Sequence, residues 1–169
     1  MMILKEGCLS FTFPAESRVS KYDEWSFYRN QFNSAFGGTK AVDIVYADSR
    51  IAWLIEVKDY RANKRTKAID LGDEIAQKVR DSLAGLVAAQ YNANDIQEKK
   101  LAKKMLSCEE IRVVLHLEQP TQYSKLFPRA IDPSKILLKL KQLLRSIDAH
   151  PLVVDQQNFN SKLNWTVIG

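Results

Sequence analysis

The chain has 169 residues, of which 46% are hydrophobic and 27% are charged, with only 6 glycines and 5 prolines. This composition is typical of one globular domain covering residues 1–169, and it excludes a disordered, collagen-like or low-complexity protein. The 25 basic and 20 acidic residues give a net charge of +5, a mild excess that permits an acidic partner without requiring one.

The sequence carries no sign of a membrane span or a metal-binding cysteine motif. It has no apolar run approaching the roughly 20 residues that cross a bilayer, and residues 1–6 lack the pattern of a signal peptide. We therefore expect a cytoplasmic protein with no membrane partner. Cys8 and Cys108 lack the spacing of a disulfide framework or a zinc site, and so do His116 and His150.

The first part of the chain alternates short predicted elements with turns. Residues 9–13 alternate apolar and polar side chains before a proline, which predicts a short edge strand. Four aromatic residues then recur at spacings of three and four, which predicts a helix at 21–33. Segments 40–47 and 50–58 are rich in β-branched and aromatic residues, and the turn residues 48–49 between them predict a hairpin.

The second part of the chain favours longer helices. Asp70 is a good N-cap for a helix at 71–91, whose apolar residues follow helical spacing and whose small residues predict close packing on a sheet. A second helix, a strand, a third helix and two short strands complete the prediction: 94–106, 111–117, 134–147, 151–154 and 165–168. This order predicts an α/β or α+β domain in which helices flank a central mixed sheet.

Two acids and a lysine fall on the predicted hairpin. Glu56 and Lys58 share one face, because side chains alternate along a strand. If residues 48–49 form a two-residue loop, Asp43 lies opposite Leu54 on that same face. Glu56 is then its diagonal neighbour, with Cβ atoms roughly 7–8 Å apart. A register slip of one residue would separate the two carboxylates onto opposite faces.

Carboxylates on such an apolar hairpin need a compensating charge. Mg²⁺ prefers hard oxygen ligands and uses one or two protein carboxylates, so Asp43 and Glu56 are candidate ligands, with the carbonyl of Val57 as a third. Lys58 would lie beside the metal-bound water and orient it, help to deprotonate it, or neutralise a phosphate. In the alternative interpretation, Asp43 is a polar strand end and Glu56 and Lys58 form a surface ion pair.

A basic segment follows the hairpin directly. Residues 58–67 hold five basic side chains and one acidic side chain. Such side chains hold phosphates, although a solvated face is the alternative. The lysines within 99–104 can extend this surface, and Gln77 or Lys78 on the following helix can reach the hairpin. The candidate nucleic-acid-binding residues are Arg61, Lys64, Arg65 and Lys67.

The pattern of Asp43 followed by Glu56-Val57-Lys58, with a helix before and after, resembles the PD-(D/E)xK nuclease superfamily, also called restriction-endonuclease-like. The resemblance covers about residues 20–117 and implies a core of αβββαβ type. It further implies Mg²⁺-dependent cutting of phosphodiester bonds, with Mn²⁺ as a substitute, Asp43 and Glu56 as metal ligands and Lys58 as the catalytic lysine. Many members carry another carboxylate on the preceding helix, for which Glu24 is the favoured match and Asp23 the alternative.

The sequence thus predicts a metal-dependent (deoxy)ribonuclease, an endonuclease in which metal-activated water attacks the phosphorus. DNA is the favoured nucleic acid, and a homodimer or a larger defence or repair complex is compatible with the small size of the chain. Two rival interpretations stay open. One is a nucleic-acid-binding module that keeps the nuclease fold with a weak or idle site, and the other is a subunit that binds a protein partner.

Overall fold

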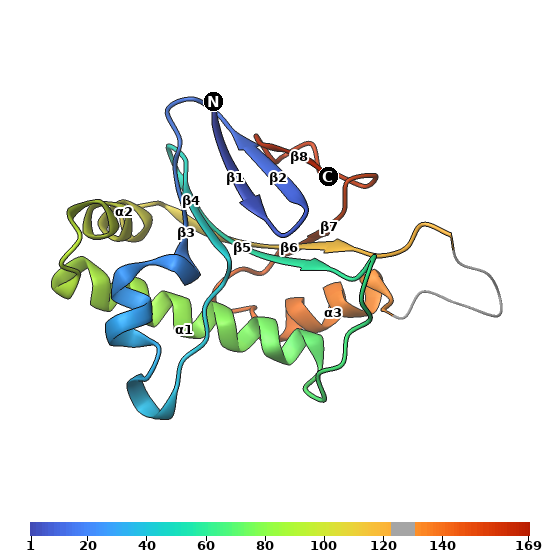
Figure 1. Cartoon of the computed structure of the whole chain (residues 1–169), viewed down its shortest axis with the longest axis horizontal. Helices are drawn as coiled ribbons and strands as arrows, with labels where there is room; N and C mark the ends of the chain where they lie inside the picture. The colour runs from blue at the N-terminus through green and yellow to red at the C-terminus, as the bar shows by residue number, and fades with distance from the viewer. Residues whose placement is uncertain (123–130) are drawn as a thin grey trace.

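A five-stranded mixed sheet forms the centre of the fold in the computed structural model, which describes residues 1–122 and 131–169 (Figure 1). The first three strands are antiparallel and the last three are parallel. In spatial order the strands are β3 (Arg18–Lys21), β4 (Ile44–Ala47), β5 (Ile51–Asp59), β6 (Glu110–Glu118) and β7 (Leu152–Val154). The predicted central mixed sheet is therefore confirmed.

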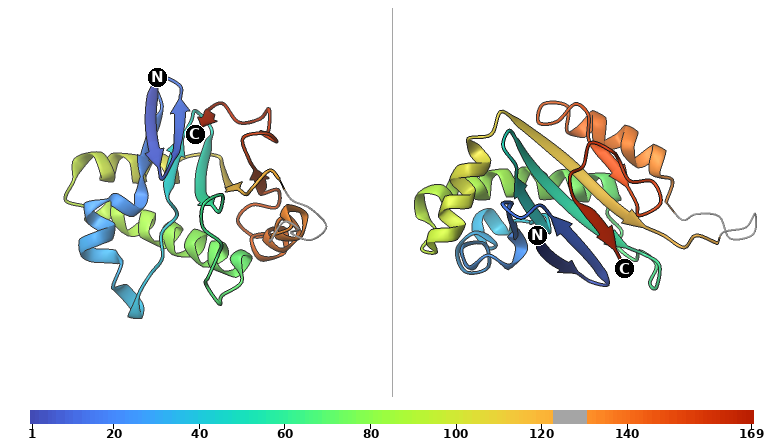
Figure 2. Two further views of the ribbon diagram at one scale, coloured as in Figure 1. Left: turned by 45° about the vertical axis from the view of Figure 1, so that its right-hand side comes forward. Right: turned by 90° about the horizontal axis from the view of Figure 1, so that it is seen from above.

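The two faces of this sheet are covered differently (Figures 1 and 2). A second, antiparallel sheet packs on one face; it consists of β1 (Met2–Glu6), β2 (Leu9–Phe13) and β8 (Thr166–Ile168). Helices cover the other face: α1 (Leu71–Asn92), α2 (Ile96–Leu106) and α3 (Pro133–Leu143). Each face has its own hydrophobic core. This arrangement confirms a mixed α/β class.

None of the helices in the described ranges is long and apolar enough to cross a membrane. The predicted strands at 9–13, 50–58, 111–117, 151–154 and 165–168 and the helices at 71–91, 94–106 and 134–147 all correspond to observed elements, with shifted ends. Pattern reasoning missed β1 and β3, two short strands with exposed faces.

The predicted helix at 21–33 is broken into two pieces. A 3-10 turn covers Tyr22–Glu24 and a π-helix covers Tyr28–Phe32. Trp25 has the extended dihedral angles φ −58° and ψ 135°, which interrupt the helix. The next two backbone N–H groups, of Ser26 and Phe27, donate to the carboxylate of Glu98 on α2 at 2.6 and 3.0 Å. Because these bonds come from a distant helix, local aromatic spacing could not predict the break.

The register of the β4–β5 hairpin differs from the prediction by two residues. Tyr46 pairs with Trp53 and Ala47 with Ala52, so the loop is longer than two residues. The carboxylate of Asp48 stabilises this loop, because its Oδ1 accepts hydrogen bonds from the backbone N–H groups of Arg50 and Ile51, at 2.8 and 2.7 Å. A shift of two preserves side-chain parity, so the predicted faces of the hairpin survive.

Through Gly85, helix α1 packs closely against the broken helical segment that contains Tyr22 and Phe32. A Cβ atom added at Gly85 would lie 1.9 Å from the hydroxyl of Tyr22 and 3.1 Å from the ring of Phe32. The helix begins after Asp70, whose side chain accepts hydrogen bonds from the first turn, as the sequence predicts. The close approach at Gly85 is therefore to the broken helical segment that contains Tyr22 and Phe32, whereas the sequence predicted close packing on the sheet.

We predict that Gly85→Ala destabilises the protein by about 1–3 kcal/mol, because the added methyl group overpacks the site. In an unconstrained helix the same change would stabilise by about 1 kcal/mol. Tyr22→Phe removes the hydroxyl that lies closest to the added methyl group. The double variant Gly85→Ala, Tyr22→Phe is therefore expected to recover most of the stability that Gly85→Ala alone loses. Urea unfolding followed by tryptophan fluorescence measures both. Equal losses in the single and double variants would contradict this explanation.

Candidate functional site

Asp43 and Glu56 lie together on the helix-covered side of the central sheet. Continuing the observed register by one residue places them opposite each other, since Ile44 pairs with Ile55. The side chain of Glu56 is fully buried and that of Asp43 is 13% exposed. The backbone N–H of Val57 donates to Asp43 Oδ2 at 2.7 Å. The structure therefore brings the two predicted carboxylates even closer in register than the sequence suggested.

Two lysines neutralise the buried Glu56. Lys58 Nζ lies 2.7 Å and Lys78 Nζ 2.5 Å from Glu56 Oε1. Lys78 comes from α1 and also lies 3.8 Å from Asp43 Oδ1. Burial opposes the charged form of Lys58, but the adjacent Glu56 outweighs burial and raises the pKa of Lys58. Of the two helical candidates named from sequence, Gln77 and Lys78, it is Lys78 that reaches the carboxylates.

Burial raises the pKa of Asp43 to about 7, and the charge of Glu56 adds to the effect, while Lys78 opposes it. Asp43 is therefore a carboxyl group that changes charge near neutral pH. Such a shift is common at functional sites, because desolvation together with a specific charged neighbour tunes proton affinity.

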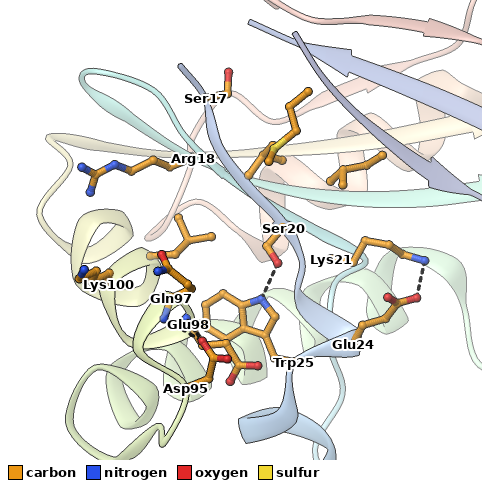
Figure 3. Close-up of a pocket in the computed structure, with 14 residues that line it drawn as sticks. Ser17, Arg18, Ser20, Lys21, Glu24, Trp25, Asp95, Gln97, Glu98 and Lys100 are labelled. Carbon is orange, nitrogen blue, oxygen red and sulfur yellow. Dashed lines mark hydrogen bonds and ion pairs between the residues drawn. The ribbon is translucent and has the colours of Figure 1, made fainter. Parts of the chain in front are cut away.

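The two candidate carboxylates before the sheet have separate environments. Glu24 is exposed and its Oε1 lies 2.8 Å from Lys21 Nζ, a pairing that lowers the pKa of Glu24 (Figure 3). Burial raises the pKa of Asp23 to about 6, and the charge of Asp43 adds to this. Its buried Oδ1 has no hydrogen-bond partner among the described residues. Of these two carboxyl groups, Asp23, the alternative match, is the one whose pKa is raised by the charge of Asp43.

A second ion cluster adjoins the first and was not predicted from sequence. Glu74 is buried in α1 and accepts Arg65 Nη2 and Lys67 Nζ, each at 2.6 Å. Burial opposes the ionisation of Glu74, yet Lys67 and Arg65 prevail and lower its pKa to about 2. Lys58 Nζ lies 3.8 Å from Glu74 and links the two clusters. In the sequence, the one sign of this second cluster is that Glu74 lies one helical turn before Lys78 and therefore on the same face of the predicted helix.

The predicted nucleic-acid-binding residues have different roles in the segment between β5 and α1. Arg61 pairs with Asp59 at 2.7 Å and donates to the carbonyl of Gly169. Arg65 also donates to the Ile69 carbonyl, so it holds the segment in place. Lys64 is exposed and makes no hydrogen bond or ion pair within residues 1–122 and 131–169. Lys67 keeps 59% of its side chain exposed.

The lysines within 99–104 do not extend this basic segment. They lie on α2, which packs against the C-terminal part of α1, whereas the basic segment precedes the N-terminal end of α1 (Figure 1). A helix of 22 residues is about 33 Å long, since each residue rises 1.5 Å. The two basic regions therefore form separate surfaces.

A divalent cation at the carboxylate pair is chemically reasonable. Buried Glu56 Oε2 has no hydrogen-bond partner in the described part of the chain, and a hard cation would satisfy it. Over the same residues, no group of three or more His, Cys, Asp or Glu side chains is placed to hold a metal ion. Any Mg²⁺ here would therefore rest on Asp43 and Glu56, supplemented by waters or by the predicted Val57 carbonyl.

Comparison with known proteins gives one informative relative. The chain is 33% identical, over an alignment 207 positions long with gaps, to a cysteine–tRNA ligase of Neisseria meningitidis serogroup A / serotype 4A. The match includes 99% of this chain but spans only 30% of the length of the relative. No family model matches the chain, and no solved structure matches it significantly.

This relative contradicts the predicted activity. It is named as a ligase that joins cysteine and tRNA, whereas the sequence predicted a hydrolase, a Mg²⁺-dependent nuclease acting on phosphodiester bonds. The prediction of a metal-dependent (deoxy)ribonuclease or endonuclease is therefore wrong. The physical reason for the error is that a short pattern of Asp, Glu and Lys on a hairpin specifies a charged cluster, and fold and cluster alone do not determine a reaction.

We predict that Asp43→Asn changes the pH dependence of stability. Between about pH 4 and pH 7 the unfolded Asp43 is ionised while the folded group keeps its proton, so stability falls as the pH rises. Asn cannot ionise, so the variant should have a flatter profile. Above pH 7 it should be more stable than the unaltered protein by up to about 4 kcal/mol.

Urea unfolding from pH 4 to pH 8 in the presence of EDTA measures this effect. Glu110→Gln, which removes an exposed carboxylate at the start of β6, is the matched control and should leave the profile unchanged. If Asp43→Asn is less stable than the unaltered protein at pH 8, the lysines hold Asp43 ionised and our account of its pKa fails.

Proposed function

We propose that this chain is a tRNA-binding module related to part of a cysteine–tRNA ligase. The observation that carries the proposal is the 33% identity extending over 99% of the chain. Because the chain spans 30% of that ligase, we propose that it supplies binding and acts beside further ligase parts. Such a role agrees with the cytoplasmic location expected from the sequence.

The basic segment after β5 supports an RNA-binding role. Lys64 is exposed there, so its ammonium group is free to approach a phosphate, whereas the ammonium of Lys67 is paired with Glu74 at 2.6 Å although 59% of its side chain is exposed. Arg65 is fixed between buried Glu74 and the Ile69 carbonyl, and this anchor limits how far the segment can move. Lysines held on an ordered support lose less freedom when they bind a phosphate backbone. The net charge of +5 would favour the encounter.

We further propose that the core has the restriction-endonuclease-like arrangement implied by the sequence resemblance. Two antiparallel strands, β4 and β5, are followed by the long α1 and by the parallel strand β6, which supports the proposal. The carboxylates and Lys58 lie on the expected hairpin. One fold can serve unrelated functions, so this arrangement is compatible with a role in tRNA binding.

Mg²⁺ bound by Asp43 and Glu56 is part of the same proposal. A cation there would contact Glu56 Oε2, which otherwise lacks a partner among the described residues. It would also relieve the repulsion between two adjacent carboxylates and attract an RNA phosphate. Lys58 and Lys78 already neutralise much of the charge, so we expect modest affinity.

We predict that the protein binds tRNA with an affinity that falls steeply as salt rises. Lys64→Glu should weaken binding about threefold to tenfold and reduce the salt slope by about one, because one phosphate contact is lost. Filter binding or fluorescence anisotropy at several salt concentrations measures both quantities.

Lys103→Glu on α2 is the matched control, because it makes the same charge change at the other end of α1. It should weaken tRNA binding less than Lys64→Glu does. If the two variants behave alike, binding reflects net charge and the segment after β5 is not the interface. If a DNA hairpin of matched sequence binds as tightly as tRNA, the ligase-related proposal fails.

We predict that Mg²⁺ raises the melting temperature of the protein and that Glu56→Gln removes this effect. Glutamine keeps the shape of the side chain but loses the charge that binds the cation. Calorimetric titration with Mg²⁺ and Mn²⁺ provides an independent measure, and Glu110→Gln should titrate like the unaltered protein. A heat signal that survives in Glu56→Gln would exclude this pair as the cation site.

A further inference from the structure

An exposed aromatic residue stands in the turn that precedes β4. Phe36 lies in the 3-10 turn η3 (Ala35–Gly37) and is 93% exposed, the highest value of any aromatic residue in the described ranges. Ala35 before it packs against the hydrophobic core, and two glycines follow it. The ring therefore has no large apolar neighbour within the turn, and burial does not explain why a phenylalanine occupies this position.

The backbone of Phe36 is strained. Its φ of 53° and ψ of 34° lie in the left-handed region. A β carbon is disfavoured there because it approaches the following carbonyl oxygen, and a bulky side chain in that region is uncommon. Glycine adopts the region freely, as Gly37 and Gly38 do here with φ of 80° and 118°. Because strain of this kind is concentrated at binding and catalytic sites, Phe36 is a candidate binding residue.

The base of this turn is held in place by hydrogen bonds. The backbone N–H of Thr39 donates to the carbonyl of Asn33 at 2.8 Å, and its hydroxyl donates to the carbonyl of Phe32 at 2.7 Å. The next backbone N–H, of Lys40, donates to Asp81 Oδ2 on α1 at 2.9 Å. An exposed ring on a fixed base loses little freedom when it meets a ligand.

The turn projects from the same side of the molecule as the basic segment after β5. Both extend past α1, away from the central sheet, in Figure 1 and in the left view of Figure 2. Arg80 adds a cation at the base of the turn: its Nε lies 3.1 Å from Asp81 Oδ1, and 72% of its side chain is exposed. Exposed rings together with exposed cations suit single-stranded nucleic acid, since rings stack on bases while cations meet phosphates.

We propose that Phe36 stacks on an unpaired base of the bound RNA and that Arg80 meets a phosphate beside that base. This inference rests on the proposed tRNA-binding function and deepens it, because it names an unpaired nucleotide as the part of the RNA that the turn recognises. A base inside a paired stem has no free face for the ring. A single ring without large apolar neighbours in its turn fits one flat base, whereas a protein partner or a membrane is recognised by a contiguous apolar patch.

Substitutions of Phe36 separate stacking from general apolar contact. Phe36→Ala should weaken tRNA binding about tenfold, and Phe36→Tyr should preserve it because the ring remains. Phe36→Leu should weaken binding nearly as much as Phe36→Ala, since leucine keeps apolar area but has no flat ring. Tyr91→Ala is the matched control: it removes a 69% exposed aromatic side chain from the regular C-terminal turn of α1 and should change binding little. Fluorescence anisotropy measures all four variants.

Two short RNAs separate stacking from phosphate binding. One is a single strand of about eight nucleotides that carries a fluorescent adenine analogue, and the other is a duplex that contains the same sequence. The unaltered protein should prefer the single strand and quench the analogue. Phe36→Ala should lose both the preference and the quenching, yet bind the duplex like the unaltered protein. Lys64→Glu should weaken binding of both RNAs.

These measurements distinguish failure of this inference from failure of the tRNA-binding proposal. If tRNA binding depends on Lys64 but not on Phe36, the tRNA-binding proposal stands and the stacking inference is wrong. If tRNA does not bind but the single strand binds and needs the ring of Phe36, the tRNA-binding proposal fails while stacking on an unpaired base stands. If neither RNA binds, both are wrong.

The stability of Phe36→Gly provides an independent readout. Glycine relieves the strained backbone and removes no buried contact, so the melting temperature should stay unchanged or rise while tRNA binding falls as in Phe36→Ala. A lower melting temperature would show that the ring serves the fold and would overturn the inference. Full binding by Phe36→Leu would also overturn it, and so would self-association that Phe36→Ala abolishes, which would assign the ring to a second copy of the chain.

Discussion

The burial of Glu56 constrains the rest of the structure. A carboxylate with no exposed surface is strongly disfavoured unless charges or hydrogen bonds compensate it, and here two ammonium groups converge on one of its oxygens. One ammonium comes from the same strand and the other from α1. The ion pair with Lys78 therefore ties the helix layer to the sheet at a defined position. Removing either lysine would leave the remaining charges less balanced within the core.

The ion network continues from the sheet to the surface. Lys58 bridges Glu56 and Glu74, and Glu74 in turn holds Arg65 and Lys67 of the segment that precedes α1. The buried pair of Glu56 and Lys58 thereby helps to position Glu74, and Glu74 helps to position Arg65 and Lys67, because neighbouring groups in the network carry opposite charges. The shape of the basic segment is thus coupled to the carboxylates beneath it. A cation or a proton at Asp43 would change the charge balance along the same chain of contacts.

Much of the fold could be predicted from sequence, and the failures have definable causes. The long α1 and the hairpin carry strong periodic patterns, and Asp70 marks the helix start. The break at Trp25 could not be foreseen, because Glu98 on α2 supplies the bonds that replace the helix. The residues of the candidate site were predicted by parity along the hairpin. The ion pair between Lys78 and Glu56 could not be predicted, because it depends on how α1 packs on the sheet and no local pattern encodes that packing.

The carboxylates and lysine of the hairpin do not specify a nuclease. The hairpin brings Asp43, Glu56 and Lys58 together, as their spacing along the chain predicts. This geometry does not determine a reaction, because carboxylates neutralised by lysines also serve to fix a helix on a sheet and to hold a basic segment above it. In that role the same three residues need no reaction to explain them. They support the segment in which Arg65 is anchored and Lys64 is exposed, and Lys64 is the residue that the proposed tRNA-binding role would place at a phosphate.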